Sequence, residues 1–266
     1  MALSIAGSEA TGGAGAQADL KTFQELDVFG ALALTCIVSF DPQADWGHRF
    51  VPIDAQVITD QLEAITSAYP PGQLDVVKIG MLGAPSTIET VAGVLRERRF
   101  DQVVLDPVLI CKGQEPGAAL DTDNALKEQV LPLATFVTPN HFEAMSLSGM
   151  DAIESVEDLT EAARRIHRAS GAAVLAKGGV RLPGADAVDV YVDSETTEVL
   201  RAPKVGDAVV AGAGCTLAAA VAAFLAQGVS PLDAARAAKL FVTAGIEARL
   251  SSQAPFDVVW QGAESR

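Results

Sequence analysis

The sequence has few of the residues that build disulfide-bonded or zinc-bound proteins. It contains three cysteines and three histidines among 266 residues. The cysteines (Cys36, Cys111 and Cys215) form no C-x-x-C pair, and no histidine lies at metal-ligand spacing from another histidine or a cysteine. We therefore expect neither a disulfide framework nor a structural zinc site. Separated cysteines in an odd number favour a reducing, cytoplasmic location.

Positive charge is also scarce. The 19 lysines and arginines are outnumbered by 34 aspartates and glutamates, which gives a formal net charge of −15. Nucleic acids and anionic membrane surfaces attract basic patches, so we expect neither of them as a partner. The same acidity is poorly matched to any polyanionic ligand, and a phosphate-binding function would have to overcome it.

A long uninterrupted hydrophobic run is missing too. The longest stretch without a charged residue, 208–232, is dominated by alanine and interrupted by Gly212, Gly214 and Pro231. This composition predicts a buried helix with a glycine-rich start and not a membrane span. The first ten residues contain no basic region, so we expect no secretory signal.

What the sequence does contain is an alternation of apolar runs and helical patterns. Strands are expected at 2–6, 29–38, 74–79, 103–105, 133–137, 173–176 and 188–192. Helices are expected at 17–26, 54–68, 85–98, 155–169, 214–227 and 231–249. The alternation predicts an α/β protein with a central, mostly parallel sheet and helices on both faces. Without a linker or an internal repeat, residues 1–266 are expected to form one domain.

Several chemically distinctive residues follow the apolar runs closely. They are Gly7, Asp106, Asn140 with Glu143, and Lys177. Ligands of such sheets bind at the carboxyl ends of the strands. Carboxylates such as Asp106 and Glu143 are able to hold Mg²⁺, and Lys177 would place a cation near a nucleotide. Each residue alone fits an ordinary turn, helix start or surface position, and their joint placement favours a site.

The strongest local motif is Gly212-Ala213-Gly214-Cys215-Thr216 before an apolar helix. Small residues that enter a helix leave backbone N–H groups unpaired, which predicts an anion hole able to stabilise a transferring phosphoryl group. Cys215 at a helix start is expected to have a lowered thiol pKa. Its thiolate would accept a proton from a hydroxyl group or bond to an electrophile. Tight helix packing around an inert cysteine explains this segment equally well.

A second glycine motif, within 13–18, matches the dinucleotide pattern G-x-G-x-x-G/A. It would support an NAD-dependent oxidoreductase. However, the preceding strand is expected to end at about Ala6, so the glycines come several residues too late for a tight turn. We favour a loop that closes over a small ligand and keep the oxidoreductase as a distant alternative.

Six segments taken together match one family. They are AGSEATGGAGAQADLKTF at 6–23, KIGML at 78–82, DPV at 106–108, TPNHFEA at 138–144, KGG at 177–179 and GAGCT at 212–216. With them the chain resembles, over nearly its whole length, the hydroxymethylpyrimidine and pyridoxal kinase branch of the ribokinase-like superfamily. The resemblance implies a ribokinase-like fold and phosphorylation, by ATP with Mg²⁺, of a hydroxymethyl group on a heteroaromatic ring.

The resemblance also implies roles for individual residues. Gly212, Ala213 and Gly214 would form the anion hole and Cys215 would be the catalytic base. Asn140, Lys177 and Gly214 would contact ATP, with Glu143 and Asp106 on the metal side. Gly7, Asp19 and Met81 would line the heterocycle site. Relatives are often homodimers, so a homodimer is expected.

Two positions bear on the substrate. Cys111 and Cys215 resemble the cysteine pair of bacterial dual-cysteine pyridoxal kinases, in which a hemithioacetal forms with the aldehyde. Phe40 stands where kinases of thiamin biosynthesis commonly have a glutamine, and phenylalanine packs on a pyridine ring without hydrogen-bonding an aminopyrimidine. These features favour a pyridoxal kinase that makes pyridoxal 5′-phosphate. The alternatives are a hydroxymethylpyrimidine/phosphomethylpyrimidine kinase, with or without dual activity, and a non-catalytic pyridoxal phosphate carrier.

Overall fold

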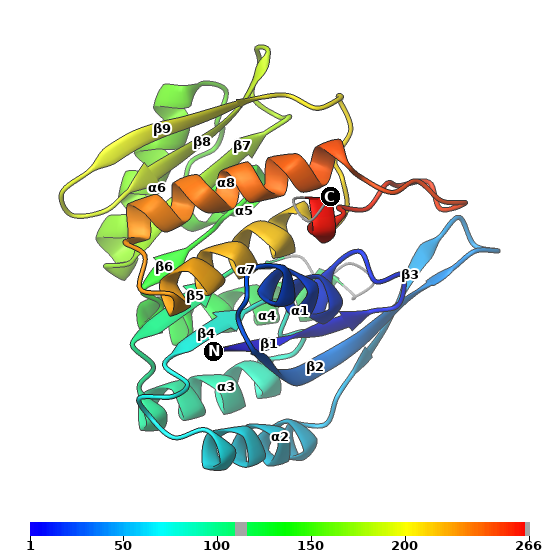
Figure 1. Ribbon diagram of the computed structural model, residues 1–266, viewed down its shortest axis with the longest axis vertical. Helices are drawn as coiled ribbons and strands as arrows, with labels where there is room; N and C mark the ends of the chain where they lie inside the picture. The colour runs from blue at the N-terminus through cyan, green and yellow to red at the C-terminus, as the bar shows by residue number, and fades with distance from the viewer. Residues whose placement is uncertain (110–115, 264–266) are drawn as a thin grey trace.

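A single nine-stranded sheet organises the computed structural model, which describes residues 1–109 and 116–263 (Figure 1). The order across the sheet is β3-β2-β1-β4-β5-β6-β7-β8-β9. The strands are β1 (Ala2–Glu9), β2 (Gly30–Asp41), β3 (Gly47–Pro52), β4 (Val76–Ile79), β5 (Gln102–Leu105), β6 (Phe136–Val137), β7 (Ala173–Gly179), β8 (Asp186–Val192) and β9 (Thr197–Pro203). The six strands from β2 to β7 in this order run parallel, while β3, β8 and β9 pair antiparallel at the two edges. The predicted, mostly parallel sheet is confirmed.

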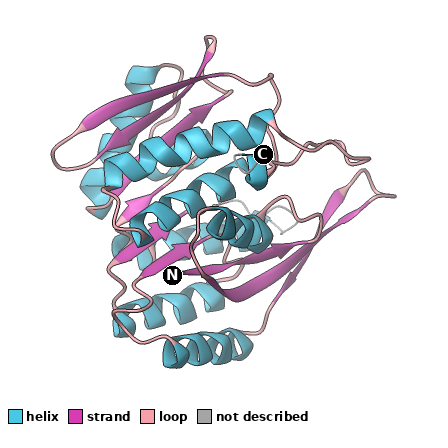
Figure 2. Ribbon diagram, in the orientation of Figure 1, coloured by secondary structure: helices cyan, strands magenta, loops and turns pink. Residues whose placement is uncertain are grey.

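Helices cover both faces of the sheet, as predicted (Figure 2). They are α1 (Gly15–Glu25), α2 (Ala55–Ala68), α3 (Pro85–Arg98), α4 (Pro116–Gln129), α5 (His141–Ser148), α6 (Val156–Ser170), α7 (Ala213–Ala226) and α8 (Pro231–Glu247). One face carries α1, α7 and α8, whose side chains share a core with Val76 and Val104 of the central strands. On the other face, α2, α3 and α4 pack on Leu3, Ile5 and their neighbours, and α5 and α6 pack on β7 and β8.

The alanine-rich helix α7 lies between α1 and α8, against the central strands β4 and β5. Nine of its 14 residues are buried. The helix is apolar all round because neighbouring elements cover it, and its small alanine side chains allow them to approach closely. None of the helices in 1–109 and 116–263 is both long and apolar enough to cross a membrane.

Several element boundaries differ from the prediction. The first strand does not end at Ala6: β1 continues to Glu9 past an irregularity in register between Ala6 and Ser8. The run 133–137 yields only two strand residues, because a 3-10 turn at Leu131–Leu133 precedes β6. The elements β3, β9, α4 and α5 were missed. Both edge strands are largely exposed and α5 has only eight residues, so these three elements lack the strong apolar periodicity of the central elements.

Candidate active site

A cavity of about 790 Å³ opens where the parallel strands end, and it gathers most of the predicted site residues. Its walls include Gly7, Phe40, Met81, Asp106, Asn140, Glu143, Lys177 and the segment 212–215. Asp19 is not among the residues that line the cavity, and its role in binding the heterocycle stays a prediction. Cys111 lies outside the residues that the structure describes.

The first turn of α7 forms one wall of the cavity. Gly212 is the N-cap, with a left-handed φ of 82°, and no side chain caps the helix. A Cβ atom on Gly212 would overlap the carbonyl oxygen of Gly13, so this position requires glycine on two grounds. Within the described part of the chain, the N–H groups of Gly214 and Cys215 have no backbone or side-chain oxygen as acceptor. The wall therefore offers N–H donors and the positive end of a helix dipole to an anion.

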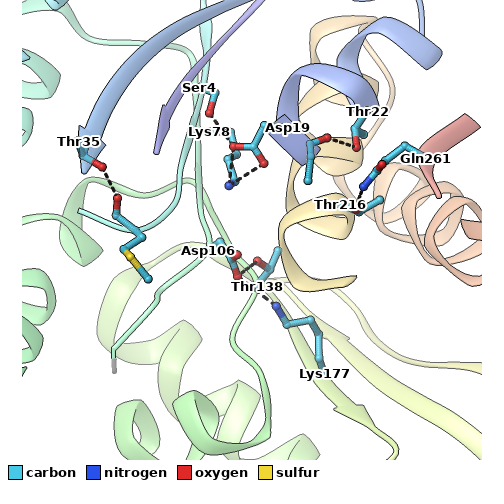
Figure 3. A network of polar contacts seen from close by, with 12 residues as sticks. Ser4, Asp19, Thr22, Thr35, Lys78, Asp106, Thr138, Lys177, Thr216 and Gln261 are labelled. Atoms are coloured by element: carbon cyan, nitrogen blue, oxygen red, sulfur yellow. Dashed lines mark hydrogen bonds and ion pairs between the residues drawn. The ribbon is translucent and has the colours of Figure 1, made fainter. Parts of the chain in front are cut away.

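A buried ion pair lies beside this helix start (Figure 3). Nζ of Lys177 donates to Oδ1 of Asp106 at 3.1 Å, and Thr138 Oγ1 lies 3.4 Å from the same oxygen. A methyl group on Gly214 would lie 3.3 Å from Nζ of Lys177, so the ammonium group and the helix N-terminus converge. Two positive groups this close favour an anion between them, since Asp106 offsets only one charge.

Asn140 and Glu143 are held at the start of α5 by a capping box. The Asn140 side chain accepts from the Glu143 N–H at 3.0 Å, and Oε2 of Glu143 accepts from the Asn140 N–H at 2.7 Å. The Glu143 side chain is buried, and burial raises its pKa to about 8, against the opposing effect of Lys177. A buried carboxyl group at the cavity wall is thus poised to ionise when a cation arrives.

The sequence analysis gave no role to Lys78, which is fully buried on β4. Its Nζ lies 2.9 Å from both carboxylate oxygens of Asp19, and Ser4 Oγ donates to Oδ2 of Asp19 at 2.6 Å (Figure 3). Lys78 is in the cavity wall, whereas Asp19 stands behind it with 0% exposure. The sequence feature that could have revealed Lys78 is a lysine inside the otherwise apolar strand V-V-K-I.

The expected lowering of the Cys215 pKa is wrong for the ligand-free protein. Burial raises the pKa of this thiol to about 11, and Lys78 is the group that opposes the rise most. The helix start alone suggested a reactive thiolate. The surrounding protein, including the carboxylates of Asp106 and Asp19, acts in the other direction.

Aromatic side chains form another part of the cavity wall. The ring of Phe40 lies 4.8 Å from that of His48 and 5.2 Å from that of Phe256, centroid to centroid. Gly7 and Met81 also line the cavity, and a Cβ atom on Gly7 would lie 2.5 Å from Sγ of Cys36 and 3.8 Å from Sδ of Met81. His48 and Phe256 were missed, because β3 and the C-terminal segment were not expected to reach the site.

The glycine loop 10–14 is organised by Glu9, a residue to which the sequence assigned no function. Its carboxylate accepts the N–H groups of Thr11, Gly13 and Ala14 at 2.7, 3.1 and 3.2 Å. These are the donors that a dinucleotide pyrophosphate would need. The loop instead packs its Gly13 against Gly212, at the start of α7. This arrangement counts against an NAD site.

A second buried ion pair, also missed, lies farther along the cavity. Lys239 on α8 donates to Oδ2 of Asp189 on β8 at 2.7 Å, and both residues line the cavity. A lysine among the apolar positions of 231–247 was the only indication in the sequence.

Comparison with known proteins agrees with this chemistry. A family model described as phosphomethylpyrimidine kinase matches residues 9–259. The pyridoxine kinase of Bacillus subtilis (strain 168) is 47% identical over 246 residues, which cover 92% of this chain and 90% of that protein.

Solved structures are similar throughout the chain. Bacillus subtilis pyridoxal kinase in an ADP complex has a TM-score of 0.91 and 43% identity, covering 99% of this chain and 98% of that one. Staphylococcus aureus pyridoxal kinase in complex with AMP-PCP and pyridoxal has a TM-score of 0.91 and 39% identity, covering 100% and 94%. The predicted ribokinase-like fold is confirmed by these similarities.

Proposed function

The chain belongs to the phosphomethylpyrimidine kinase family, and from this premise we infer that it is an ATP-dependent pyridoxal kinase. It is a phosphotransferase that acts on an alcohol group, and pyridoxal 5′-phosphate is the product. The observation that carries the inference is that one cavity is lined by two unlike groups of residues. The start of α7 and the Lys177 ammonium favour phosphate, while Phe40 and Met81 favour a flat ring.

The proposed reaction is an in-line phosphoryl transfer within this cavity. The 5′-hydroxyl oxygen of pyridoxal bonds to the γ-phosphorus of ATP, and the bond from that phosphorus to the β,γ-bridging oxygen breaks, which releases ADP. The hydroxyl proton passes to the thiolate of Cys215. The N–H groups of Gly214 and Cys215 stabilise the charge on the transferring group, and Lys177 orients the phosphates. Asn140 is proposed to contact the nucleotide.

Glu143 fits the expected Mg²⁺. Within the described residues its carboxylate forms no ion pair within 4.0 Å, and its burial favours a cation as partner. We propose that Glu143 holds Mg²⁺ directly or through water, with Asp106 nearby but already bound to Lys177. When bound, Mg²⁺ neutralises phosphate charge. The described residues contain no group of three or more His, Cys, Asp or Glu side chains able to hold a metal by themselves.

The family takes its name from a pyrimidine substrate, so phosphorylation of hydroxymethylpyrimidine is the second candidate function. A steady-state panel of pyridoxal, pyridoxine, pyridoxamine and hydroxymethylpyrimidine separates the two. We expect kcat/KM for pyridoxal to exceed that for the pyrimidine at least tenfold, because Phe40 offers the ring no hydrogen bond. Equal or better efficiency with the pyrimidine would overturn this assignment. We also propose that Cys111 assists Cys215 with the pyridoxal aldehyde.

We propose that residues 1–266 act as one kinase domain, as a cytoplasmic homodimer. The sheet that runs through the described residues supports one domain. Ile37 and Val51, register partners on β2 and β3, are 47% and 59% exposed, which supports an apolar contact with a second copy along this edge. The free thiols of Cys36 and Cys215 suit the reducing cytoplasm.

A further inference from the structure

The buried pair of Lys78 and Asp19 has no part in the reaction described above, although Lys78 lines the same cavity as the reacting thiol. Side chains alternate along β4, and Val76 packs in the core shared by α1, α7 and α8. Lys78, two residues on, therefore points to the same face, toward α7, which packs against β4. Its register partner on β1 is Ser4, and both side chains meet Asp19 of α1. Three elements thus hold one ammonium group on the face of the sheet that α7 covers (Figure 3).

Burying this cation costs free energy. An ammonium group with 0% exposure loses its hydration, and the two contacts to Asp19 at 2.9 Å recover only part of that loss. Lys78 also lines the cavity, as does Cys215. Four charged groups act electrostatically on the Cys215 thiol: the cations Lys78 and Lys177 and the carboxylates Asp19 and Asp106. The Gly15 N–H also donates to the thiol.

We propose that Lys78, locked by Asp19 and Ser4, is a positioning residue that stabilises the thiolate of Cys215. Since the two members of the pair carry opposite charge, they act on the thiolate in opposite directions. Removing the lysine charge disfavours the thiolate, and removing the aspartate charge favours it. This inference rests on the proposed role of Cys215 as the base, but its test does not depend on turnover.

The test follows the alkylation of Cys215 by iodoacetamide from pH 6 to 11, without substrates, by mass spectrometry of the Cys215 peptide. Only the thiolate reacts, so the rate reports its population. Lys78→Met is expected to slow alkylation at pH 8 by about tenfold or more and to move the profile to higher pH. Asp19→Asn is expected to speed it several-fold and to move the profile to lower pH.

Lys239→Met is the matched control, since it also removes the lysine of a buried ion pair and Lys239 is not among the charged groups with the largest effect on the Cys215 thiol. We expect its Cys215 profile to stay within twofold of wild type. If the substitutions only loosened the site, the alkylation rate of Cys215 would change in the same direction in Lys78→Met and Asp19→Asn, and that outcome would overturn the proposal. An unchanged alkylation profile in Lys78→Met would overturn it as well. If Lys78→Met does not fold, Asp19→Asn alone still tests the proposal. Alkylation of Cys215 that is slower than in wild type, or equally fast, would contradict the predicted increase.

Turnover of Cys215→Ala tests the proposed function separately. Unchanged turnover there removes the base role of Cys215, whereas the alkylation profiles test the action of Lys78 on the thiol whatever that turnover is. The two failures are therefore distinguishable.

Discussion

At the residue scale, the buried carboxyl group of Glu143 links stability to pH. Its folded pKa of about 8 exceeds the ordinary value of 4.5, so the ligand-free fold retains a proton that the unfolded chain releases. The free energy of unfolding should therefore fall as pH rises from 4.5 to 8 and level off above. Glu143→Gln removes this loss and keeps an acceptor for the capping box. We expect the ligand-free variant to be about 1–3 kcal/mol more stable than wild type at pH 8.5, with little difference at pH 5.

Urea denaturation at the two pH values measures this difference, with the exposed Glu195→Gln as the control. The same Glu143 variant should lose at least tenfold in kcat, because the carboxylate proposed to hold Mg²⁺ is removed and Asp106 is already paired with Lys177. A variant less stable than wild type at pH 8.5 would contradict the assigned direction of the pKa shift.

The residue types that follow the strands predicted where the site lies, but the sequence did not predict the protonation states of those residues. Asp106, Asn140, Glu143 and Lys177 could be predicted because parallel strands bring their carboxyl ends to one edge. The raised pKa of Cys215 could not, since it depends on burial and on side chains from other elements. Asp19 was assigned to the cavity wall because a motif does not reveal which member of an ion pair faces the ligand.

At the scale of elements, the start of α7 depends on its contact with the glycine loop. Gly212 and Gly228 have the same φ of 82°, but only Gly212 has a neighbour that a Cβ atom would strike. Gly228→Ala should cost about 1 kcal/mol from backbone strain and leave turnover unchanged. Gly212→Ala adds a collision with Gly13 and should cost about 2–4 kcal/mol, with at least a hundredfold loss of kcat.

Thermal denaturation and steady-state kinetics of the two variants separate strain from collision. Equal effects in both would mean that backbone conformation alone explains the requirement for glycine at position 212, and that loop 10–14 does not fix the anion hole.

The central elements were predictable because their apolar patterns are long. The helix predicted at 85–98 coincides with α3, and the helix predicted at 214–227 lies within one residue of α7. The edge strand β3 and the segment around Phe256 were not predictable, since their side chains are largely exposed and their places depend on distant contacts. These two missed segments bring His48 and Phe256 to the cavity wall beside Phe40.

At the scale of the whole molecule, a net charge of −15 and a polyanionic substrate are compatible because the cations beside the start of α7 are local and largely buried. Lys78 and Lys177 have side-chain exposures of 0% and 12%, and backbone N–H groups at the start of α7 add further donors. Salt screens exposed charges strongly and buried ones weakly. Added salt should therefore screen the repulsion between the acidic surface and the nucleotide more than it weakens the attraction inside the site.

This balance predicts an unusual salt response for nucleotide binding. Between 20 and 300 mM tetramethylammonium chloride, which avoids any specific effect of potassium or sodium, Kd for AMP-PCP with Mg²⁺ should change less than threefold. A surface cluster of lysines and arginines would instead lose affinity by about tenfold or more over this range, because each exposed pair is screened. Isothermal titration calorimetry measures Kd directly. A tenfold weakening would mean that surface cations, and not the start of α7 with its buried lysines, bind the phosphates.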